Sequence, residues 1–340
     1  MEKFQKVFEL LSGDDVSDEV FNEVVNEVKE LLWNLKELSR SKEQEVEINP
    51  LNDSRVAYWH AKDVIKGRFP EGEVAIAQNA KYAYHYAKDV IKGVFLGGEA
   101  VIAQDAQYAY LYARDILKNR FPEGEAIIAQ DAEIACEYAE HVIEGRFPEG
   151  EAVIAQDART SHWYAMNVIL GRFSEGEAAI AQDATMARAY AEFVIQGKFP
   201  AGEAAIAQDF KQVYSYAKYV IKGRFPEGEA VIAQDAQYAY KYAKGVLKGR
   251  FPEGEAAIAQ NARYSYNYAR EVLEGRFSEG EAIIAQDVCW AYYYARDVLQ
   301  GRFSEGEAVI AQDAQYATRY ALCLVKDYSV FNKMFLETAE

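Results

Sequence analysis

The sequence has few cysteines and histidines and no long apolar run. Its three cysteines, Cys136, Cys289 and Cys323, are an odd number at unrelated spacings, which favours free thiols in a reducing cytoplasm over a disulfide framework. The four histidines are scattered, so a zinc site is not expected. No apolar run approaches the ~18 residues of a membrane span, and the start, MEKFQKVFELLSGDD, is too acidic for a signal peptide. These absences predict a cytoplasmic protein with no metal, no cofactor and no membrane partner.

Familiar catalytic motifs are missing as well. The patterns GxGxxG, P-loop, HExxH and CxxC do not occur. Cys136 and His162 are 26 residues apart and could place a nucleophile beside a base. Two tolerated substitutions at one variable position are the simpler interpretation, so the sequence predicts that the protein is not an enzyme.

One repeated motif fills most of the chain. The glutamate that ends GRFPEGE, or a near copy of it, recurs every 26 residues at Glu73, Glu99, Glu125, Glu151, Glu177, Glu203, Glu229, Glu255, Glu281 and Glu307. A fixed period of this length is typical of a stack in which each unit touches only its neighbours. The sequence therefore predicts an all-α, right-handed superhelical α-solenoid of about ten 26-residue helix–turn–helix repeats, with helical N- and C-terminal caps.

Each repeat contains the signals of a shorter and a longer helix. In the repeat that starts at Phe121, Asp131 precedes a helical pattern and is typical of an N-cap. This predicts a longer helix from about Ala132 to about Glu144, after a shorter helix from about Glu123 to Gln130. Gly145 occupies a position that is glycine in nine of ten copies, and we expect it to adopt the left-handed conformation beyond the longer helix.

The invariant side chains are interpreted as scaffold. Ile76, Ala87 and Phe69 keep the same residue type in all ten copies and are expected to be buried. Tyr86 is also tyrosine in all ten copies. We expect it to wedge between helices, with its hydroxyl bonded to a neighbour such as the Glu73 row.

Polar positions at the corners predict further structural contacts. Arg68 and Glu71 are both altered in the same two repeats, those with Val94 and Lys198, which predicts an ion pair at the i,i+3 spacing. The Gln78 amide is expected to satisfy backbone groups at the corner of the next repeat.

A serine replaces the first-turn proline in three repeats. In one of them Ser174 is followed three residues later by Glu177, which predicts a capping box.

The ends of the chain depart from the repeat, and a family resemblance covers the middle. Residues 1–52 are predicted to be a helical acidic N-terminal cap, 53–325 the tandem-repeat solenoid and 326–340 the C-terminal cap. The motif YAKYVIKGRFPEGE, from Tyr216 to Glu229, resembles the short α-helical tandem repeats YAxxVIxGR(F/W)xxxE of bacteriophage and some bacterial proteins. The resemblance implies a binding scaffold and favours a viral origin.

The variable positions are the candidates for function. The positions of Tyr82 and Tyr84 keep their tyrosines in most outer repeats and largely lose them between Glu133 and Tyr219. A helical wheel places most variable side chains away from the alanine face, with Tyr84 at its edge. A partner-binding surface that faces away from the alanine core is predicted at His162, Trp163, Arg188, Phe193 and Tyr219.

Three functions are compatible with these patterns. The favoured one is a non-catalytic scaffold that binds a partner protein with a basic surface, because a net charge of −17 repels nucleic acid. Together with the resemblance, this suggests a phage-encoded inhibitor of a host defence protein, acting in the host cytoplasm. The alternatives are an acidic DNA-mimic decoy of a DNA-acting enzyme, and an aromatic-ladder binder of a nucleotide or single-stranded nucleic acid.

Overall fold

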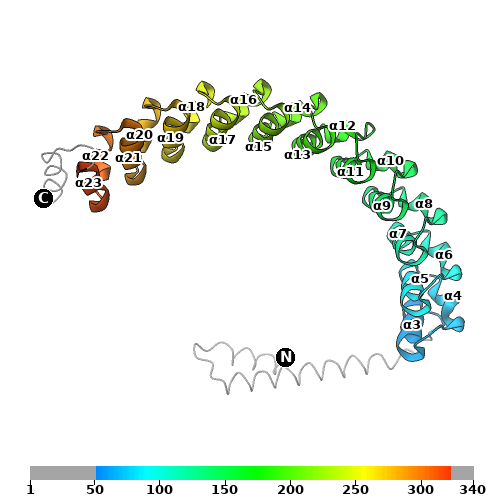
Figure 1. Cartoon of the computed structure of the whole chain (residues 1–340). Coiled ribbons are helices and arrows are strands. Elements are labelled where there is room, and N and C mark those ends of the chain that lie inside the picture. The colour runs from blue at the N-terminus through cyan, green and yellow to red at the C-terminus, as the bar shows by residue number, and fades with distance from the viewer. Residues whose placement is uncertain (1–50, 323–340) are drawn as a thin grey trace, which may run out of the picture. The chain divides into compact units, whose positions relative to one another are not determined.

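Residues 51–322 are described by a computed structural model, in which every regular element is a helix (Figure 1). Over this range there is no strand, and the expected all-α repeat solenoid is confirmed. The chain divides into two units, Met1–Val101 and Ile102–Glu340. The predicted caps lie outside the described residues, apart from residues 51 and 52. The hand of the superhelix stays a prediction.

The described part of the first unit, from residue 51 on, has a longer helix followed by alternating shorter and longer helices. A longer helix consists of an α-helical stretch followed by a π-helical stretch (η). The elements are α3 (Ser54–Trp59), η1 (His60–Ile65), the 3₁₀-helix η2 (Pro70–Gly72), α4 (Glu73–Ile76), α5 (Ala80–His85), η3 (Tyr86–Ile91) and α6 (Leu96–Ile102), which ends where the second unit begins.

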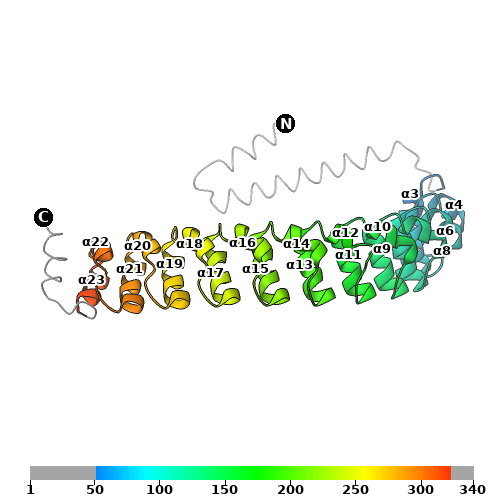
Figure 2. The same ribbon diagram turned by 90° about the horizontal axis from the view of Figure 1, so that it is seen from above.

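The second unit continues the same alternation. Figures 1 and 2 show its longer helices side by side in one layer and its shorter helices in another. The longer helices are α7 (Ala106–Tyr112) with η4 (Ala113–Leu117), α9 (Ala132–Tyr138) with η5 (Ala139–Ile143), α11 (Ala158–Tyr164) with η6 (Ala165–Ile169), α13 (Ala184–Ala189) with η7 (Tyr190–Ile195), α15 (Phe210–Ser215) with η8 (Tyr216–Ile221), α17 (Ala236–Tyr242) with η9 (Ala243–Leu247), α19 (Ala262–Tyr268) with η10 (Ala269–Leu273), α21 (Val288–Tyr294) with η11 (Ala295–Leu299), and α23 (Ala314–Tyr320). The shorter helices are α8 (Pro122–Ile128), α10 (Pro148–Ile154), α12 (Glu177–Ile180), α14 (Pro200–Ile206), α16 (Pro226–Ile232), α18 (Pro252–Ile258), α20 (Ser278–Ile284), and the 3₁₀-helix η12 (Ser304–Gly306) leading into α22 (Glu307–Ile310).

The core lies between each longer helix and the shorter helix that follows it, as for α13 and α14. Two rows of mostly small side chains are buried, with Ala187 in one and Ala191 in the other, and so is the isoleucine row, with Ile206 as an example. Burying an isoleucine or phenylalanine side chain contributes about 1.5–3 kcal/mol. The buried rows expected from the sequence are therefore confirmed.

One glycine per repeat is required by the packing at the corner. Phe121 is buried in the corner, and a Cβ on Gly124 would lie only 2.7 Å from both the Ala109 Cβ and the Phe121 Cδ1. Such contacts are too short for any residue larger than glycine. Gly124 therefore lets the shorter helix approach both the phenylalanine and the preceding longer helix.

The longer helices begin as expected but end differently. The Asp131 carboxylate accepts a hydrogen bond from the Ile134 N–H at 3.0 Å, which confirms the N-cap. At the other end Glu144, with φ of 53°, is the left-handed residue, and no described glycine has positive φ. The Glu144 and Gly145 N–H groups both donate to the Ala139 carbonyl. The prediction for Gly145 was wrong because the wider π-helical turn closes one residue earlier.

A hydrogen-bonded network, here called the corner network, joins the two helices of a repeat. Arg224 donates from Nε and Nη2 to the two carboxylate oxygens of Glu229, at 2.9 and 2.6 Å. The Tyr242 hydroxyl donates to Glu229 Oε1 and accepts the N–H of Phe225, both at 2.9 Å. The expected tyrosine–glutamate bond is therefore confirmed for Tyr242 and Glu229.

The partner predicted for the arginine row was wrong. Arg68 pairs with Glu73, five residues on, and not with Glu71. The corner residue Phe69 has φ of −124° and ψ of 80°, so no continuous helix connects Arg68 to Glu71. Nothing in the structure explains why the Arg68 and Glu71 rows change in the same repeats. We call this arginine–glutamate ion pair the arginine fork. It occurs at Arg68–Glu73, Arg120–Glu125, Arg146–Glu151, Arg172–Glu177, Arg224–Glu229, Arg250–Glu255, Arg276–Glu281 and Arg302–Glu307.

Two further corner predictions need correction. The Gln130 amide, in the row of Gln78, donates to the Ala126 carbonyl of its own shorter helix at 3.1 Å, and not to the next repeat. The Ser174 hydroxyl donates to Glu175, so no capping box forms. Glu177 is not available for one, because the arginine fork and a tyrosine hydroxyl occupy its carboxylate.

Candidate functional site

The repeats between Glu133 and Tyr219 are called the central repeats. Outside them, a second network links neighbouring longer helices. The Tyr266 hydroxyl donates to Asp297 of the next repeat at 2.5 Å, and Arg270 donates to the same hydroxyl at 3.0 Å. In the first unit Tyr58, Lys62 and Asp89 form the equivalent triad. We call this tyrosine–cation–acid triad the face lock, because it ties one longer helix to the next along their shared face.

The central repeats lack most residues of the face lock, with Tyr214 as the one tyrosine retained. Cys136, His162 and Arg188 stand at the tyrosine position of three consecutive repeats. At the acid position Phe193 and Tyr219 are aromatic. The stretch predicted from the sequence is therefore also the stretch in which neighbouring longer helices lose this polar tie.

The same repeats expose apolar side chains. Met166, Leu170, Phe193 and Tyr219 are 45, 81, 55 and 49% exposed. Among the described residues of the second unit, the only other large apolar side chain exposed to a similar degree is Leu322. Met166 lies in η6 and Leu170 directly follows it, while Phe193 lies in η7 and Tyr219 in η8. The segment η6 packs against η7, and η7 packs against η8. These four exposed side chains on neighbouring segments are called the central patch below.

The five residues predicted for the site do not all lie on this patch. Phe193 and Tyr219 do, and they face outward as expected. Arg188 is only 19% exposed and is held by Glu192 and by Gln212 Oε1, with its guanidinium 5.9 Å from the centre of the Phe193 ring. His162 and Trp163 are half-buried. His162, Trp163 and Arg188 are therefore less exposed than a partner-binding surface suggests, and their contact with a partner stays a prediction.

His162 is an imidazole placed against the next repeat. Its Nε2 is buried and makes no hydrogen bond within the described residues. Burial, followed by the nearby positive charge of Arg188, lowers the pKa of His162. The ring is therefore neutral at pH 7 and acts as a packing group.

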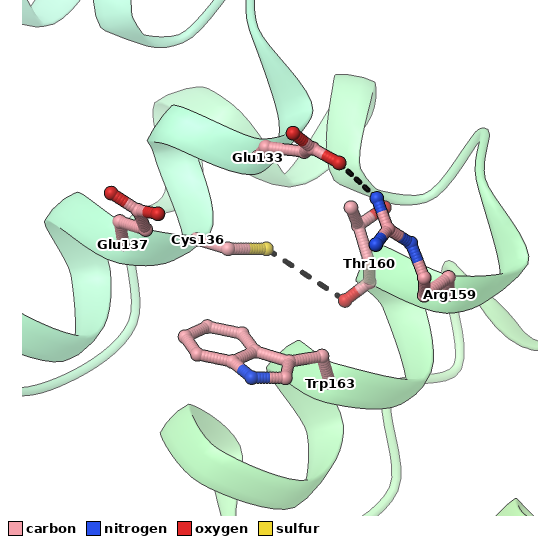
Figure 3. Close-up of a pocket in the computed structure, with 6 residues that line it drawn as sticks. All are labelled: Glu133, Cys136, Glu137, Arg159, Thr160 and Trp163. Carbon is pink, nitrogen blue, oxygen red and sulfur yellow. Dashed lines mark hydrogen bonds and ion pairs between the residues drawn. The ribbon is translucent and has the colours of Figure 1, made fainter. Parts of the chain in front are cut away.

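Trp163 lines a pocket between α9 and α11 of about 300 Å³ (Figure 3). Figure 3 shows the indole facing the Cys136 thiol, with Glu137 on one side and the Glu133–Arg159 ion pair on the other. The Cys136 thiol is directed to the Thr160 carbonyl, with Sγ and O 3.7 Å apart. The lining residues are Glu133, Cys136, Glu137, Arg159, Thr160 and Trp163.

The pocket exists because two aromatic rings are missing. Four repeats further on, the positions of Cys136 and Thr160 are occupied by Tyr240 and Tyr264, whose rings stack with centroids 6.0 Å apart. The equivalent pair in the following repeat is Tyr266 and its tryptophan partner, 5.3 Å apart. Replacing such a pair with a thiol and a hydroxyl removes both rings and leaves the space between the helices open.

The environment of Cys136 does not favour a nucleophile. Burial, and then the negative charges of nearby carboxylates, raise the pKa of Cys136 to about 12. A thiol in this environment stays protonated at pH 7, whereas a reactive cysteine needs a lowered pKa. Its Sγ atom contacts the Thr160 carbonyl.

Sequence reasoning missed Met166, Leu170 and the pocket. Met166 and Leu170 could have been found, because their repeat positions are charged or polar in nearly every other copy. The helical wheel placed Tyr84 only at the edge of the alanine face, whereas Tyr84 and Tyr110 are fully buried. A wheel describes one helix only, and these rings are covered by a second one.

No protein-family model matches the chain, and no curated protein or solved structure matches it. No helix in the range 51–322 combines the length and apolarity needed to cross a bilayer. The same range holds no group of three or more His, Cys, Asp or Glu side chains placed to bind a metal ion.

Proposed function

We propose that the protein is a non-catalytic repeat scaffold that binds a partner protein through the central patch. The observation that carries the proposal is that Met166, Leu170, Phe193 and Tyr219 are all exposed and lie on, or directly after, consecutive π-helical segments of the second unit. Single exposed apolar residues are ordinary on a protein surface, whereas adjoining ones mark interaction sites.

The chemistry of the patch suits a protein partner. Exposed phenylalanine and tyrosine on a rigid helical surface give large contact areas at a small entropic cost, and aromatic and arginine residues supply many interface hot spots. Arg188 adds a cation beside Phe193, but Glu192 already neutralises it. The patch is therefore apolar at its centre and has no uncompensated positive charge from Arg188.

The surroundings favour a partner with a basic surface. The chain has a net charge of −17. Four carboxylates lie close enough to Cys136 to raise its pKa, those of Asp157, Glu133, Glu140 and Glu137. The negative electrostatic potential of these charges accelerates association with a positively charged protein and repels nucleic acid phosphates.

The biological role in this proposal rests on the repeat motif. Because the motif resembles repeats in bacteriophage proteins, we propose that the partner is a host protein, such as a defence protein, and that binding inhibits it in the host cytoplasm. A scaffold inhibits by covering a surface, so this role needs no catalytic group.

The two alternative functions have weaker physical support. An acidic DNA mimic needs free carboxylates, but the Glu229 row is held by arginine forks and the Asp131 row caps helices. An aromatic ladder needs accessible rings, but Tyr110 and Tyr266 are buried between longer helices. Among the described residues, the rings that are about half exposed are Trp59, Phe193 and Tyr219, which are too few for a ladder.

The test is capture of a partner by variants that remove the patch. Phe193→Asn with Tyr219→Asn removes both rings, and asparagine is already present at the same repeat position as Asn167. Val94→Gln with Leu96→Ser is the matched control, because both of these apolar side chains are exposed outside the patch.

Tagged wild-type protein and the two variants are incubated with lysate of the cells that naturally express the gene. We expect one protein that is captured by the wild type and the control and lost with the patch variant. Its purified form should bind the patch variant at least about 30-fold more weakly, since even one aromatic hot spot contributes about 2 kcal/mol or more and the variant removes two rings. Equal capture by all three proteins, with unchanged melting, would refute the proposed site.

A further inference from the structure

We propose that the Trp163 pocket receives the side chain of an arginine from the partner protein. This inference rests on the proposed function, and it names the group that the partner inserts beside the central patch. The pocket lies between α9 and α11, and α11 continues directly into η6, which carries Met166 of the patch.

The first argument is the aromatic wall. The Trp163 indole faces the open space of the pocket in Figure 3. Cations bind over the faces of aromatic rings, tryptophan binds them best, and arginine is found there more often than lysine. A planar guanidinium can stack on the indole. A neutral aliphatic side chain in the same place would make only apolar contacts with the ring.

The second argument is the charge of the lining. Arg159 is already paired with Glu133, so these two charges compensate each other. Glu137 remains, and the Tyr110 hydroxyl beside it is neutral at pH 7. A guanidinium in the pocket could meet the indole with its face and the Glu137 carboxylate with its edge.

The third argument is size and origin. A volume of about 300 Å³ corresponds to the share of roughly ten waters in the liquid, which is enough for a guanidinium and the methylene groups behind it. In later repeats the same space is filled by stacked rings such as Tyr240 and Tyr264. Cys136 and Thr160 thus remove a packing contact and open a space beside a tryptophan.

A direct test uses a small arginine compound and no partner. The protein is labelled with 5-fluorotryptophan, and the Trp163 resonance is assigned by its loss in Trp163→Phe. N-acetyl-arginine-N-methylamide is titrated, with the citrulline compound as the neutral control of nearly the same shape. We expect a saturable shift of the Trp163 resonance with the arginine compound, at a dissociation constant of about 1–20 mM, and at least fivefold weaker binding of the citrulline compound.

Variants locate the binding site. Glu137→Gln should weaken binding about threefold or more, because it removes the carboxylate and keeps the shape. Cys136→Tyr with Thr160→Tyr, which restores the rings of later repeats, should abolish binding while the protein still melts cooperatively. Glu123→Gln changes an exposed carboxylate outside the lining and should leave binding unchanged. Equal shifts with the citrulline compound, or binding that survives the ring-restoring variant, would overturn the inference.

The two proposals can fail separately. If the arginine compound does not bind but the patch variant loses its partner, the pocket inference is wrong and the proposed function stands. If the compound binds as expected but the patch variant keeps every partner, the pocket is a cation site and the proposed function is wrong. With a purified partner, the ring-restoring variant should reduce affinity whenever both proposals hold.

Discussion

Replacing Tyr242 with phenylalanine isolates the contribution of the corner network. The substitution removes one oxygen atom and keeps the buried ring. In the native protein that oxygen accepts the N–H of Phe225 and donates to Glu229, both at 2.9 Å. Both contacts are buried, so water cannot replace the lost hydroxyl without a change in packing.

The magnitude follows from these two bonds. A buried N–H left without an acceptor costs about 1–3 kcal/mol, and a hydrogen bond to a charged group contributes about 1.5–3 kcal/mol. Glu229 keeps its arginine fork, which offsets part of the second loss. We therefore expect Tyr242→Phe to destabilise its repeat by about 2–4 kcal/mol.

Hydrogen exchange is the suitable assay because a repeat stack opens locally. The Phe225 amide should exchange about 30- to 1000-fold faster in Tyr242→Phe, since each 1.4 kcal/mol corresponds to a factor of ten. Tyr264→Phe is the control, because this tyrosine is half-buried in the next longer helix and belongs to no corner network. A change below fivefold at Phe225, or an equal change in the control, would refute the proposed energetics.

Three further predictions follow from the repeat. Gly254→Ala should lower the free energy of unfolding by about 1–3 kcal/mol in chemical denaturation, because the new Cβ would lie 2.7 Å from Ala239 Cβ. Gly249→Ala is the control and should be tolerated, because its new Cβ would have only Leu247 O nearby, at 4.0 Å. Equal losses in the two variants would contradict this prediction. On acidification, melting temperatures should fall below about pH 4.5: the Arg224 fork is the largest cause that lowers the pKa of Glu229 from its usual 4.5, so the stabilisation is present above that value and is lost as pH falls through the lowered pKa. On the alkaline side, burial raises the pKa of Tyr86 from 10.0 to about 12, so its stabilisation is present below pH 10 and should be lost between about pH 10 and 12. A melting temperature that stays constant across either range would contradict the corresponding prediction.

The helices could be predicted because the chain repeats its own signals. Asp131 is one of ten aspartates or asparagines at the same position, so its role as an N-cap rests on more than one residue. The Tyr86–Glu73 bond could be anticipated for the same reason, since both residues are invariant across the copies. Ten copies within one chain show which side chains the fold requires.

The errors arose where local rules assume a regular helix. The i,i+3 pairing of Arg68 with Glu71 needs continuous helical backbone, and the extended conformation of Phe69 interrupts it. The preference of glycine for left-handed backbone pointed to Gly145, but the π-helical turn places that conformation at Glu144. Neither the extended corner nor the π-turn has a sequence signature of its own.

The candidate site was located only in part for a related reason. Phe193 and Tyr219 could be predicted as exposed because their repeat position is acidic in several other copies. The half-burial of Trp163 and the space beside it depend on Cys136 and Thr160, which belong to two different repeats. A pocket formed by missing side chains on two helices cannot be seen from the periodicity of either helix.

The central repeats retain one network and lose the other, and this separation bears on function. At Tyr164 and Tyr190 the corner network is intact, with each hydroxyl bonded to its glutamate at 3.0 Å. The face lock is missing from the same repeats, where His162 and Arg188 replace its tyrosines. If natural selection on these repeats were simply relaxed, both networks would be expected to be lost alike. Loss of the face lock alone changes one surface while the packing of the stack is kept, which is what a partner that contacts this surface would require.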